Sequence, residues 1–271
     1  MKLFAIRDES AEVQKDLAYL LYYETEKKFY IELPEDADPW ETPMLLSSFA
    51  GDGVKTVNAY WSKVWVQQRI VPADRQNLGQ ILKDNHLKEY DEYALLMLGM
   101  GRCAQDDCYL VPMEEEALPA EIRGRFNMRI EDSVPLDEYH MLVFFRDGIV
   151  RKCSLKEYFE AHATFAPLLK NEGLFCSVMI QPGGYGLEWD VNMGIPCNEL
   201  YQMGDRIPLT LADFQSFAVR RVVNVAEAAE ILGCTRQNID YLTRSGYLHP
   251  IKSSGKNTLY LKSEVLQRNW Q

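Results

Sequence analysis

Two short amphipathic segments separated by a single glycine constrain the fold of this chain more than any other feature. Asn224 stands where a helix cap is expected, and Gly233 stands where a first helix must stop and turn, since glycine adopts positive φ without steric cost. Thr235 is placed to cap a second helix, which Gly246 would end. Helical spacing predicts the inward faces: Val225, Ala228, Ala229 and Leu232 in the first helix, Ile239 and Leu242 in the second. Residues 224–246 are therefore predicted to form a helix-turn-helix.

The first turn of the second helix carries the polar side chains that point to a function. Helical geometry places Arg236, Gln237 and Asn238 outward. Arginine pairs with guanine edges, and glutamine or asparagine pairs with adenine, so these three residues are candidates to recognise DNA bases. The alternative interpretation is a helical hairpin used for protein contact, in which the alanines and leucines form only a core.

Residues 223–268 resemble the winged helix-turn-helix of the MerR and excisionase-like regulators. The resemblance rests on Ala-Glu-Ala-Ala-Glu-Ile-Leu-Gly, then Thr-Arg-Gln-Asn-Ile, then Ser-Gly-Tyr-Leu. It implies that the first-turn residues enter the major groove, that Arg244 contacts phosphate, and that a wing lies beside a strand at residues 258–261. The DNA-binding residues implied in this way are Arg236, Gln237, Asn238, Arg244, Lys252, Lys256 and Asn257.

The sequence departs from this family at two points. The wing, Ser-Ser-Gly-Lys-Asn, carries fewer basic residues than the family's wings, and Asp240 places an acid in the middle of the second helix. Either departure would lower the affinity for DNA, unless Asp240 accepts a hydrogen bond from cytosine.

Charge divides the chain into an acidic body and a basic end. From residue 220 onward there are eight Lys or Arg against four Asp or Glu, a balance of +4. The whole chain has 29 basic and 40 acidic residues, so residues 1–219 hold 21 against 36, a balance of −15. A segment whose charge is opposite to that of its body is typical of a DNA-binding module attached to a domain that does not bind DNA.

Length and composition exclude several classes of protein. The chain has 271 residues, 47% of them hydrophobic, enough for two or three domains with real cores. No apolar run approaches the roughly 20 residues that a membrane span needs, and the first residues become charged too soon for a signal peptide. Six scattered cysteines do not form a disulfide framework. A cytoplasmic protein without membrane contact is expected.

Residues 138–204 are predicted to form a second unit with the order β-β-α-β-β-α. Strands at 140–145 and 149–153 flank an Asp147-Gly148 turn, and Ser154 is predicted to cap a helix. A second hairpin is predicted from 175–180 and 187–190 around Pro-Gly-Gly, and Pro196 then begins a short helix. Trp189 is predicted to be a core residue. The two glycines of the turn lack the following lysine and helix of a phosphate loop.

This second unit resembles a bacterial domain-of-unknown-function family of short proteins, some of which are encoded beside toxin-like partners. The matching motifs are Phe-Arg-Asp-Gly, Phe-Ala-Pro-Leu-Leu, Leu-Phe-Cys-Ser-Val, Leu-Glu-Trp-Asp and Asn-Glu-Leu-Tyr. The resemblance implies a fold more than a function.

The first 130 residues show alternating strand patterns followed by helical ones. Strands are predicted at 2–6, 17–24 and 29–33, and helices are predicted to begin near Thr42-Pro43, at Ala59 and after a cap at Asp74. In the second helix Trp61, Val64, Trp65 and Gln68 recur at helical spacing. We predict that this stripe is core, with a partner groove as the alternative.

The predicted class is α+β: two small antiparallel-sheet α+β units followed by a C-terminal helix-turn-helix. The domains are predicted at 1–130, 136–207 and 218–271, with polar connectors at 113–135 and 205–217.

Nothing in the sequence predicts a catalytic site or a metal site. Cys103 and Cys108, with Asp106 and Asp107 between them, lack the spacing and the second ligand pair of a zinc site, so a turn is the preferred interpretation. The four histidines are dispersed and none lies in a motif that supplies a base and its orienting acid. No metal, cofactor or catalytic residue is assigned, and the chain is not expected to be an enzyme.

The sequence therefore predicts a sequence-specific DNA-binding protein, a transcriptional regulator of bacterial or phage type. Its partner is double-stranded DNA, and a homodimer is expected because one such module contacts few base pairs. The alternative is an antitoxin-like protein-interaction module whose acidic body binds a basic partner protein.

Overall fold

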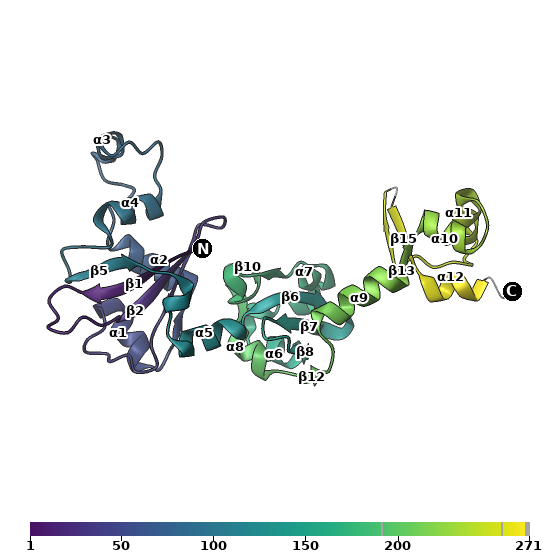
Figure 1. The fold of residues 1–271 in the computed structure, drawn as a ribbon, viewed down its shortest axis with the longest axis horizontal. Coiled ribbons are helices and arrows are strands. Elements are labelled where there is room, and N and C mark those ends of the chain that lie inside the picture. The colour runs from purple at the N-terminus through teal and green to yellow at the C-terminus, as the bar shows by residue number, and fades with distance from the viewer. Residues whose placement is uncertain (191, 256, 269–271) are drawn as a thin grey trace.

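A computed structural model describes residues 1–190, 192–255 and 257–268. Figure 1 shows three lobes that follow one another in chain order along the longest axis of the molecule, and α9 spans from the second to the third. Each lobe contains antiparallel strands together with helices, which confirms the predicted α+β class. Within the described residues, no helix is both long and apolar enough to cross a bilayer.

The first lobe is built on a five-stranded antiparallel sheet with the order β4-β3-β2-β1-β5. Its strands are β1 (Lys2–Asp8), β2 (Ala18–Tyr23), β3 (Lys28–Glu32), β4 (Thr56–Val57) and β5 (Cys108–Pro112). The first three confirm the predicted strands within two residues at each end. Successive side chains of β1 alternate between two cores, because Phe4 and Ile6 pack in one cluster while Leu3 and Ala5 pack in another.

Helices cover both faces of this sheet. They are α1 (Met44–Gly51), α2 (Ala59–Gln67), α4 (Glu92–Gly99) and α5 (Ala120–Asn127), while α3 (Leu78–Asp84) does not cover the sheet. Residues of α1, α2 and α4 join the first core, while Ile122 and Phe126 of α5 are buried in the second. The segment predicted to be a solvated charged connector therefore contains a packed helix, because its two large apolar residues stand four apart among the charges.

The two tryptophans of α2 differ in burial, so the predicted core stripe is only partly correct. Trp65 is 1% exposed and lies in the core, as predicted, whereas Trp61 is 39% exposed. The predicted cap at Asp74 is wrong. The helix α3 begins at Leu78, and the residue at its N-cap position is Asn77. In Figure 1, α3 stands away from the sheet, and none of its residues is buried.

The second lobe contains two small antiparallel sheets around one core. One has the order β12-β8-β7-β6 and the other β11-β10-β9. The strands are β6 (Ile130–Pro135), β7 (His140–Phe145), β8 (Val150–Ser154), β9 (Met179–Ile180), β10 (Gly186–Asp190), β11 (Met193–Pro196) and β12 (Asp205–Ile207). Its helices are α6 (Lys156–Ala161), α7 (Glu172–Cys176) and α8 (Cys197–Gln202). Its short 3-10 turns are η2 (Asp137–Tyr139), η3 (Ala163–Phe165), η4 (Leu168–Lys170) and η5 (Pro182–Gly184), while η1 (Glu115–Ala117) precedes α5 in the first lobe.

The predicted β-β-α-β-β-α order is correct for the first hairpin and incomplete after it. Ser154 ends β8 opposite His140 and does not cap α6, which follows Leu155. Phe175 belongs to a helix, because the Asn171 side chain accepts a hydrogen bond from the Leu174 amide and starts α7 there. The short strands β6, β11 and β12 were not predicted as strands.

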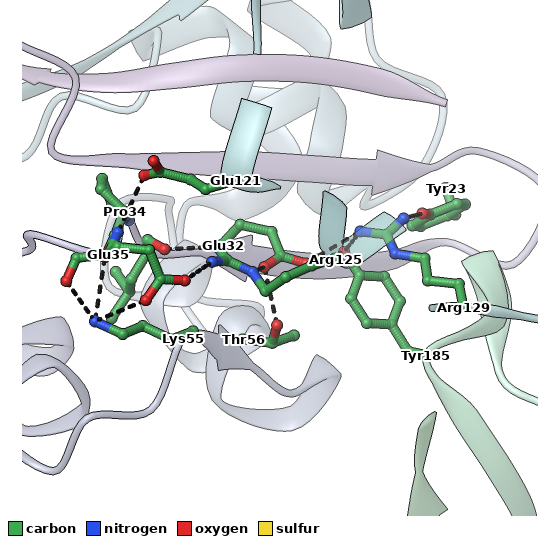
Figure 2. A network of polar contacts seen from close by, with 11 residues as sticks. Tyr23, Glu32, Pro34, Glu35, Lys55, Thr56, Glu121, Arg125, Arg129 and Tyr185 are labelled. Carbon is green, nitrogen blue, oxygen red and sulfur yellow. Dashed lines mark hydrogen bonds and ion pairs between the residues drawn. The ribbon is translucent and has the colours of Figure 1, made fainter. Parts of the chain in front are cut away.

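Arg129, which follows α5, joins the first lobe to the second (Figure 2). Its guanidinium donates to the Tyr23 hydroxyl at 2.9 Å, to Glu32 at 3.0 Å and to the Tyr185 hydroxyl of the second lobe. The guanidinium also lies 3.4 Å from the ring centroid of Phe126 and 4.0 Å from that of Tyr185. Burial raises the pKa of Tyr185, so its hydroxyl stays protonated and donates to Glu32 at 3.0 Å.

Glu32 is the centre of this network and is only 1% exposed. Arg125 donates to it at 3.1 Å and Thr56 at 2.9 Å, in addition to Arg129 and Tyr185. Arg125 also donates to Glu35 and to the Leu33 carbonyl oxygen, both at 2.6 Å. A buried carboxylate is tolerated when donors surround it, and here the donors come from both lobes.

Candidate nucleic-acid interface

In its described residues the third lobe contains helices and a small sheet. The helices are α9 (Leu211–Arg221), α10 (Val225–Ile231), α11 (Arg236–Arg244) and α12 (Lys262–Arg268). The strands β13 (Val222–Asn224), β15 (Asn257–Leu261) and β14 (Lys252–Ser254) lie side by side in that order. Neither β13 nor α12 was predicted.

Local hydrogen bonds begin both central helices where the sequence predicted. The Asn224 side chain accepts from the Ala226 amide at 2.8 Å and the Glu227 amide at 3.1 Å, and Glu227 accepts in return from the Asn224 amide at 2.8 Å. This reciprocal capping box defines the start of α10. Thr235 accepts from the Asn238 amide at 3.3 Å and starts α11.

The turn between α10 and α11 confirms the predicted role of glycine. Gly233 has φ of 61°, and the Cys234 amide donates to the Ala229 carbonyl oxygen at 2.9 Å. Gly246 ends α11 with φ of 72°. These positions need positive φ, which a side chain would disfavour.

One apolar core holds the helices against the sheet. It contains Val223, Ala228, Ala229, Ile239, Leu248, Tyr260 and Val265. The Thr243 hydroxyl lies 2.8 Å from the Tyr260 hydroxyl and links α11 to β15. His249 contacts Glu264 of α12 through both its amide, at 2.9 Å, and its ring nitrogen, at 2.8 Å. The orientation of α11 relative to the hairpin is thus set by packing and by polar contacts.

The predicted first-turn residues are all exposed on α11. The side chains of Arg236, Gln237 and Asn238 lie outside the core, while Ile239, next in the chain, is fully buried. Arg244 is exposed at the other end of the same helix. The helix therefore presents its polar residues to solvent along one side, as its spacing predicted.

The structure brings three of the predicted residues to one groove. Arg236, Lys252 and Asn257 line a groove of about 840 Å³ between the start of α11 and the β14–β15 hairpin. Gln237, Asn238 and Arg244 lie on α11 outside the lining of that groove, and Lys256 lies outside the described residues. Asp240 lines the same groove one turn after Arg236, so the unusual acid shares the groove with the wing residue Lys252.

Sequence reasoning missed two exposed aromatic residues on this lobe. Tyr241 is 60% exposed on α11, four residues after Gln237, and Tyr247 is 48% exposed just after the helix. Tyrosine hydroxyls commonly donate to nucleic-acid phosphates, so Tyr241 belongs with the candidate contacts. The signal was available, because an inward face at Ile239 and Leu242 places Tyr241 outside.

The cysteine and acid cluster of the first lobe has a structural role. Asp106 pairs with Arg69, whose guanidinium stacks 3.7 Å above the Trp65 ring, and accepts from the Cys108 amide at 3.1 Å. Burial raises the pKa of the Cys108 thiol to about 12, so it is not a thiolate at neutral pH. In the part of the chain that the structure describes, no group of three or more His, Cys, Asp and Glu side chains is placed to hold a metal ion.

The second lobe contains a segment that is similar to a known protein family. Residues 132–204 match DUF2442, a family of proteins of unknown function. The match covers roughly a quarter of the chain, from within β6 to two residues past the end of α8, and confirms the predicted resemblance of this unit to a family of unknown function. No curated protein and no solved structure matches the chain.

The DUF2442 region places its predicted turn and core residues as expected. Gly148 has φ of 81°, and Asp147 accepts from the Ile149 amide at 2.9 Å. Trp189 is 6% exposed, and its indole donates to the Phe175 carbonyl oxygen at 2.7 Å. The tryptophan is a core residue with its single donor satisfied.

Two glycines of the DUF2442 region allow close packing, Gly183 against the first lobe and Gly184 against β6 of its own lobe. A Cβ atom at Gly183 would lie 2.1 Å from the Tyr23 hydroxyl oxygen, and one at Gly184 would lie 2.2 Å from the Ile130 carbonyl oxygen. Both residues also have positive φ. Close approach of backbone and side chains explains this glycine pair, which the sequence had already separated from a phosphate loop.

Proposed function

We propose that this chain is a sequence-specific DNA-binding protein, a transcriptional regulator of bacterial or phage type that acts in the cytoplasm through a winged helix-turn-helix at residues 218–271. The observation that carries the proposal is the arrangement of α11. Its first turn presents Arg236, Gln237 and Asn238 to solvent, and the adjacent hairpin adds Lys252 and Asn257. An exposed helix start beside a hairpin that carries a lysine has the shape to enter a major groove while the hairpin lies along the DNA backbone.

Each residue has a distinct part in this proposal. Arg236, Gln237 and Asn238 contact base edges, because their side chains carry the donors and acceptors that distinguish base pairs. Arg244 and Tyr241 contact phosphates, which supply affinity and little sequence information. The resemblance to MerR and excisionase-like regulators supports the same assignment from the sequence.

A homodimer completes the proposal. One helix contacts only a few base pairs, and regulators of this type commonly place two copies on half-sites about one helical turn apart. The free surface of α9 is the candidate contact between copies: none of its residues is buried, and Phe217 and Val219 are 54% and 84% exposed. An isolated helix of 11 residues is only marginally stable in water, which favours a partner for it.

The test uses the full chain and the DNA upstream of its own gene. Fluorescence anisotropy should show binding that weakens as salt rises, since Lys and Arg contacts release counterions from DNA. Arg236→Ala should weaken binding to the preferred fragment by roughly 10-fold or more, because a bidentate guanine contact contributes about 1–3 kcal/mol. Arg123→Ala, at an exposed position on α5, is the matched control and should leave the affinity unchanged.

Two results would contradict the proposal. One is the absence of salt-dependent binding to the upstream fragment and to a library of genomic fragments. The other is equal affinity of the Arg236→Ala and wild-type chains for every fragment bound.

The acidic body favours one alternative, an antitoxin-like module that binds a basic partner protein. Residues 1–219 carry the balance of −15 that such a partner would neutralise. Purification of the native protein from its source separates the two functions: a stoichiometric basic protein bound to the chain favours the alternative, and a lone dimer favours the regulator.

A further inference from the structure

A cavity of about 680 Å³ opens where the first two lobes meet. Its walls come from β3, α2 and neighbouring loops of the first lobe, from α5, and from the DUF2442 region through Gln181, Tyr185 and Asn198. This volume falls within the range of small-molecule sites, about 300–1,000 Å³. The residues proposed to bind DNA do not line it. The cavity is therefore a second candidate site with its own chemistry.

The polar wall of the cavity is positively charged. Lys55, Arg125 and Arg129 line it together with one acid, Glu32. Glu35 pairs with Lys55 and Arg125 from beside the cavity and still leaves an excess of one positive charge. This excess occurs within a body whose balance is −15. A positively charged cavity attracts anions even when the domain around it is acidic.

Lys55 is the cation with hydrogen-bonding capacity to spare (Figure 2). Its ammonium donates to the Glu35 carbonyl oxygen at 2.7 Å, but its other contacts are long: 3.5 Å to the Pro34 carbonyl oxygen and 3.8 Å to the Glu35 carboxylate. All three guanidinium nitrogens of Arg125, in contrast, have partners within 3.1 Å. An ammonium has three donors, so Lys55 can turn toward a bound anion without leaving the Glu35 carbonyl.

Aromatic side chains form another part of the lining, and Trp61 is the accessible one among them. Trp61 is 39% exposed, and its ring lies 6.0 Å from that of Phe49 at an interplanar angle of 62°. Tyr30 of the first lobe stacks on Tyr185 of the second with ring centroids 3.7 Å apart, and this buried pair also lines the cavity. Met128 adds a flexible apolar side chain. Such walls favour a planar ring over a sugar or an alkyl chain.

Amide groups complete the lining. Within the described residues, the side-chain amides of Gln181 and Asn198 have no hydrogen-bond partner, and the Asn58 side chain accepts only from the Trp61 amide. Carboxamides offer both donors and acceptors to polar substituents on a ring.

From this arrangement we propose that the junction between the first lobe and the DUF2442 region binds a small planar aromatic anion. The ring lies against Trp61 and Phe49, and the anionic group contacts the Lys55 ammonium. The network around Glu32 holds the two lobes in place, so the site is formed before the ligand arrives. Because both lobes supply its walls, the ligand stabilises their contact.

The test uses two fluorescent probes on the full chain. One is the aromatic anion 8-anilinonaphthalene-1-sulfonate, and the other is its uncharged parent, N-phenyl-1-naphthylamine. Each is titrated by fluorescence, with circular dichroism to confirm that each variant is folded. Trp61→Ala should weaken binding of both probes by about 10-fold, because it removes the aromatic wall. Lys55→Gln should weaken binding of the anion by a similar factor and leave the uncharged probe unchanged.

Two matched controls separate the site from the general surface. Trp40→Ala removes a tryptophan that is 95% exposed and outside the cavity, and Lys63→Gln removes a lysine of α2 that pairs with Glu92. Neither should change binding of either probe. No saturable binding of the anion to the wild-type chain, or equal effects of Trp61→Ala and Trp40→Ala, would overturn the proposal. Equal weakening of both probes by Lys55→Gln would also overturn it, by showing an apolar site without anion recognition.

Discussion

Asp240 shows how one charge can set the strength of the proposed DNA interface. It lines the groove that also holds Arg236 and Lys252, so a carboxylate stands where the phosphates and base edges of DNA would approach. The repulsion is largest at low salt, because the Debye length is then longest. The confirmed predictions for single residues, such as the helix caps at Asn224 and Thr235, depend on hydrogen bonds to residues at most three positions away in the sequence.

Asp240→Asn should therefore increase the affinity for DNA, by roughly 3-fold to 10-fold at low salt, since each charge contact with DNA is strongly salt-dependent. Anisotropy titrations at two salt concentrations measure the change, which should shrink as salt rises. Glu230→Gln removes an exposed acid of α10 outside the groove and is the control. A lower affinity of the Asp240→Asn chain would instead indicate that Asp240 accepts a hydrogen bond from cytosine.

Arg129 is the residue on which the junction of the first two lobes most depends. Replacing it with alanine leaves Glu32 buried with fewer donors, and removing one partner of a buried ion pair costs about 3–5 kcal/mol. Arg129→Ala should lower the free energy of unfolding by this order in urea titrations followed by circular dichroism. Arg123→Ala, at an exposed position, should change it by less than about 0.5 kcal/mol. Similar stabilities of the two variants would contradict the assigned role of the network.

At the scale of elements, local sequence patterns predicted the hairpin around Asp147 and Gly148 but not the adjacent strand β6 or the helix α7. The Asp147-Gly148 turn and its two strands could be predicted because turn chemistry and alternation act within a few residues. The strand β6 could not, because its sequence is polar and it forms only by pairing with β7. Phe175 was assigned to a strand because a short apolar run has no period that separates strand from helix.

Gly184 offers a test of how closely these elements approach one another. It has φ of 79°, and a Cβ atom would lie 2.2 Å from the Ile130 carbonyl oxygen. Gly184→Ala should therefore destabilise the chain by well over the roughly 1 kcal/mol expected from positive φ alone. Gly53→Ala isolates the backbone effect, since its φ is 71° and nothing lies within 4 Å. Thermal unfolding should show a clearly larger decrease for Gly184→Ala, and equal decreases would show that the close approach has no cost.

At the scale of the whole molecule, α9 determines how the third lobe relates to the other two. Phe214 packs against Phe144 of the second lobe with ring centroids 5.2 Å apart, while the rest of the helix faces solvent. The helix begins with a capping box between Thr210 and Asp213, which stabilises its start, and none of its residues is buried. A surface of this kind suits contact with a second copy, as the proposed regulator requires.

Phe217→Glu should convert the proposed dimer into a monomer and weaken DNA binding by more than about 10-fold, because the two half-sites then bind independently. Size-exclusion chromatography with light scattering measures the mass, and anisotropy measures the affinity. Gln215→Glu adds the same charge on another side of α9 and should leave both unchanged. A wild-type chain that is monomeric at micromolar concentration would contradict the proposed dimer. The anisotropy titration would then measure whether a single copy binds DNA.

The sequence by itself determined the features that depend on neighbours in the chain: the caps and glycine turns of α10 and α11, the first hairpins, and the α+β class. Those features involve hydrogen bonds and φ values within a few residues. Only the tertiary structure placed Glu32, Arg129 and Tyr185 together. Arg129 lies 97 residues from Glu32 and 56 residues from Tyr185 in the sequence, and the three meet because the two lobes pack against each other. The same long-range packing turned a charged connector into α5 and left Trp61 at the mouth of a cavity. Local pattern has no information about such contacts, since burial of a charged or aromatic side chain depends on which distant surface covers it.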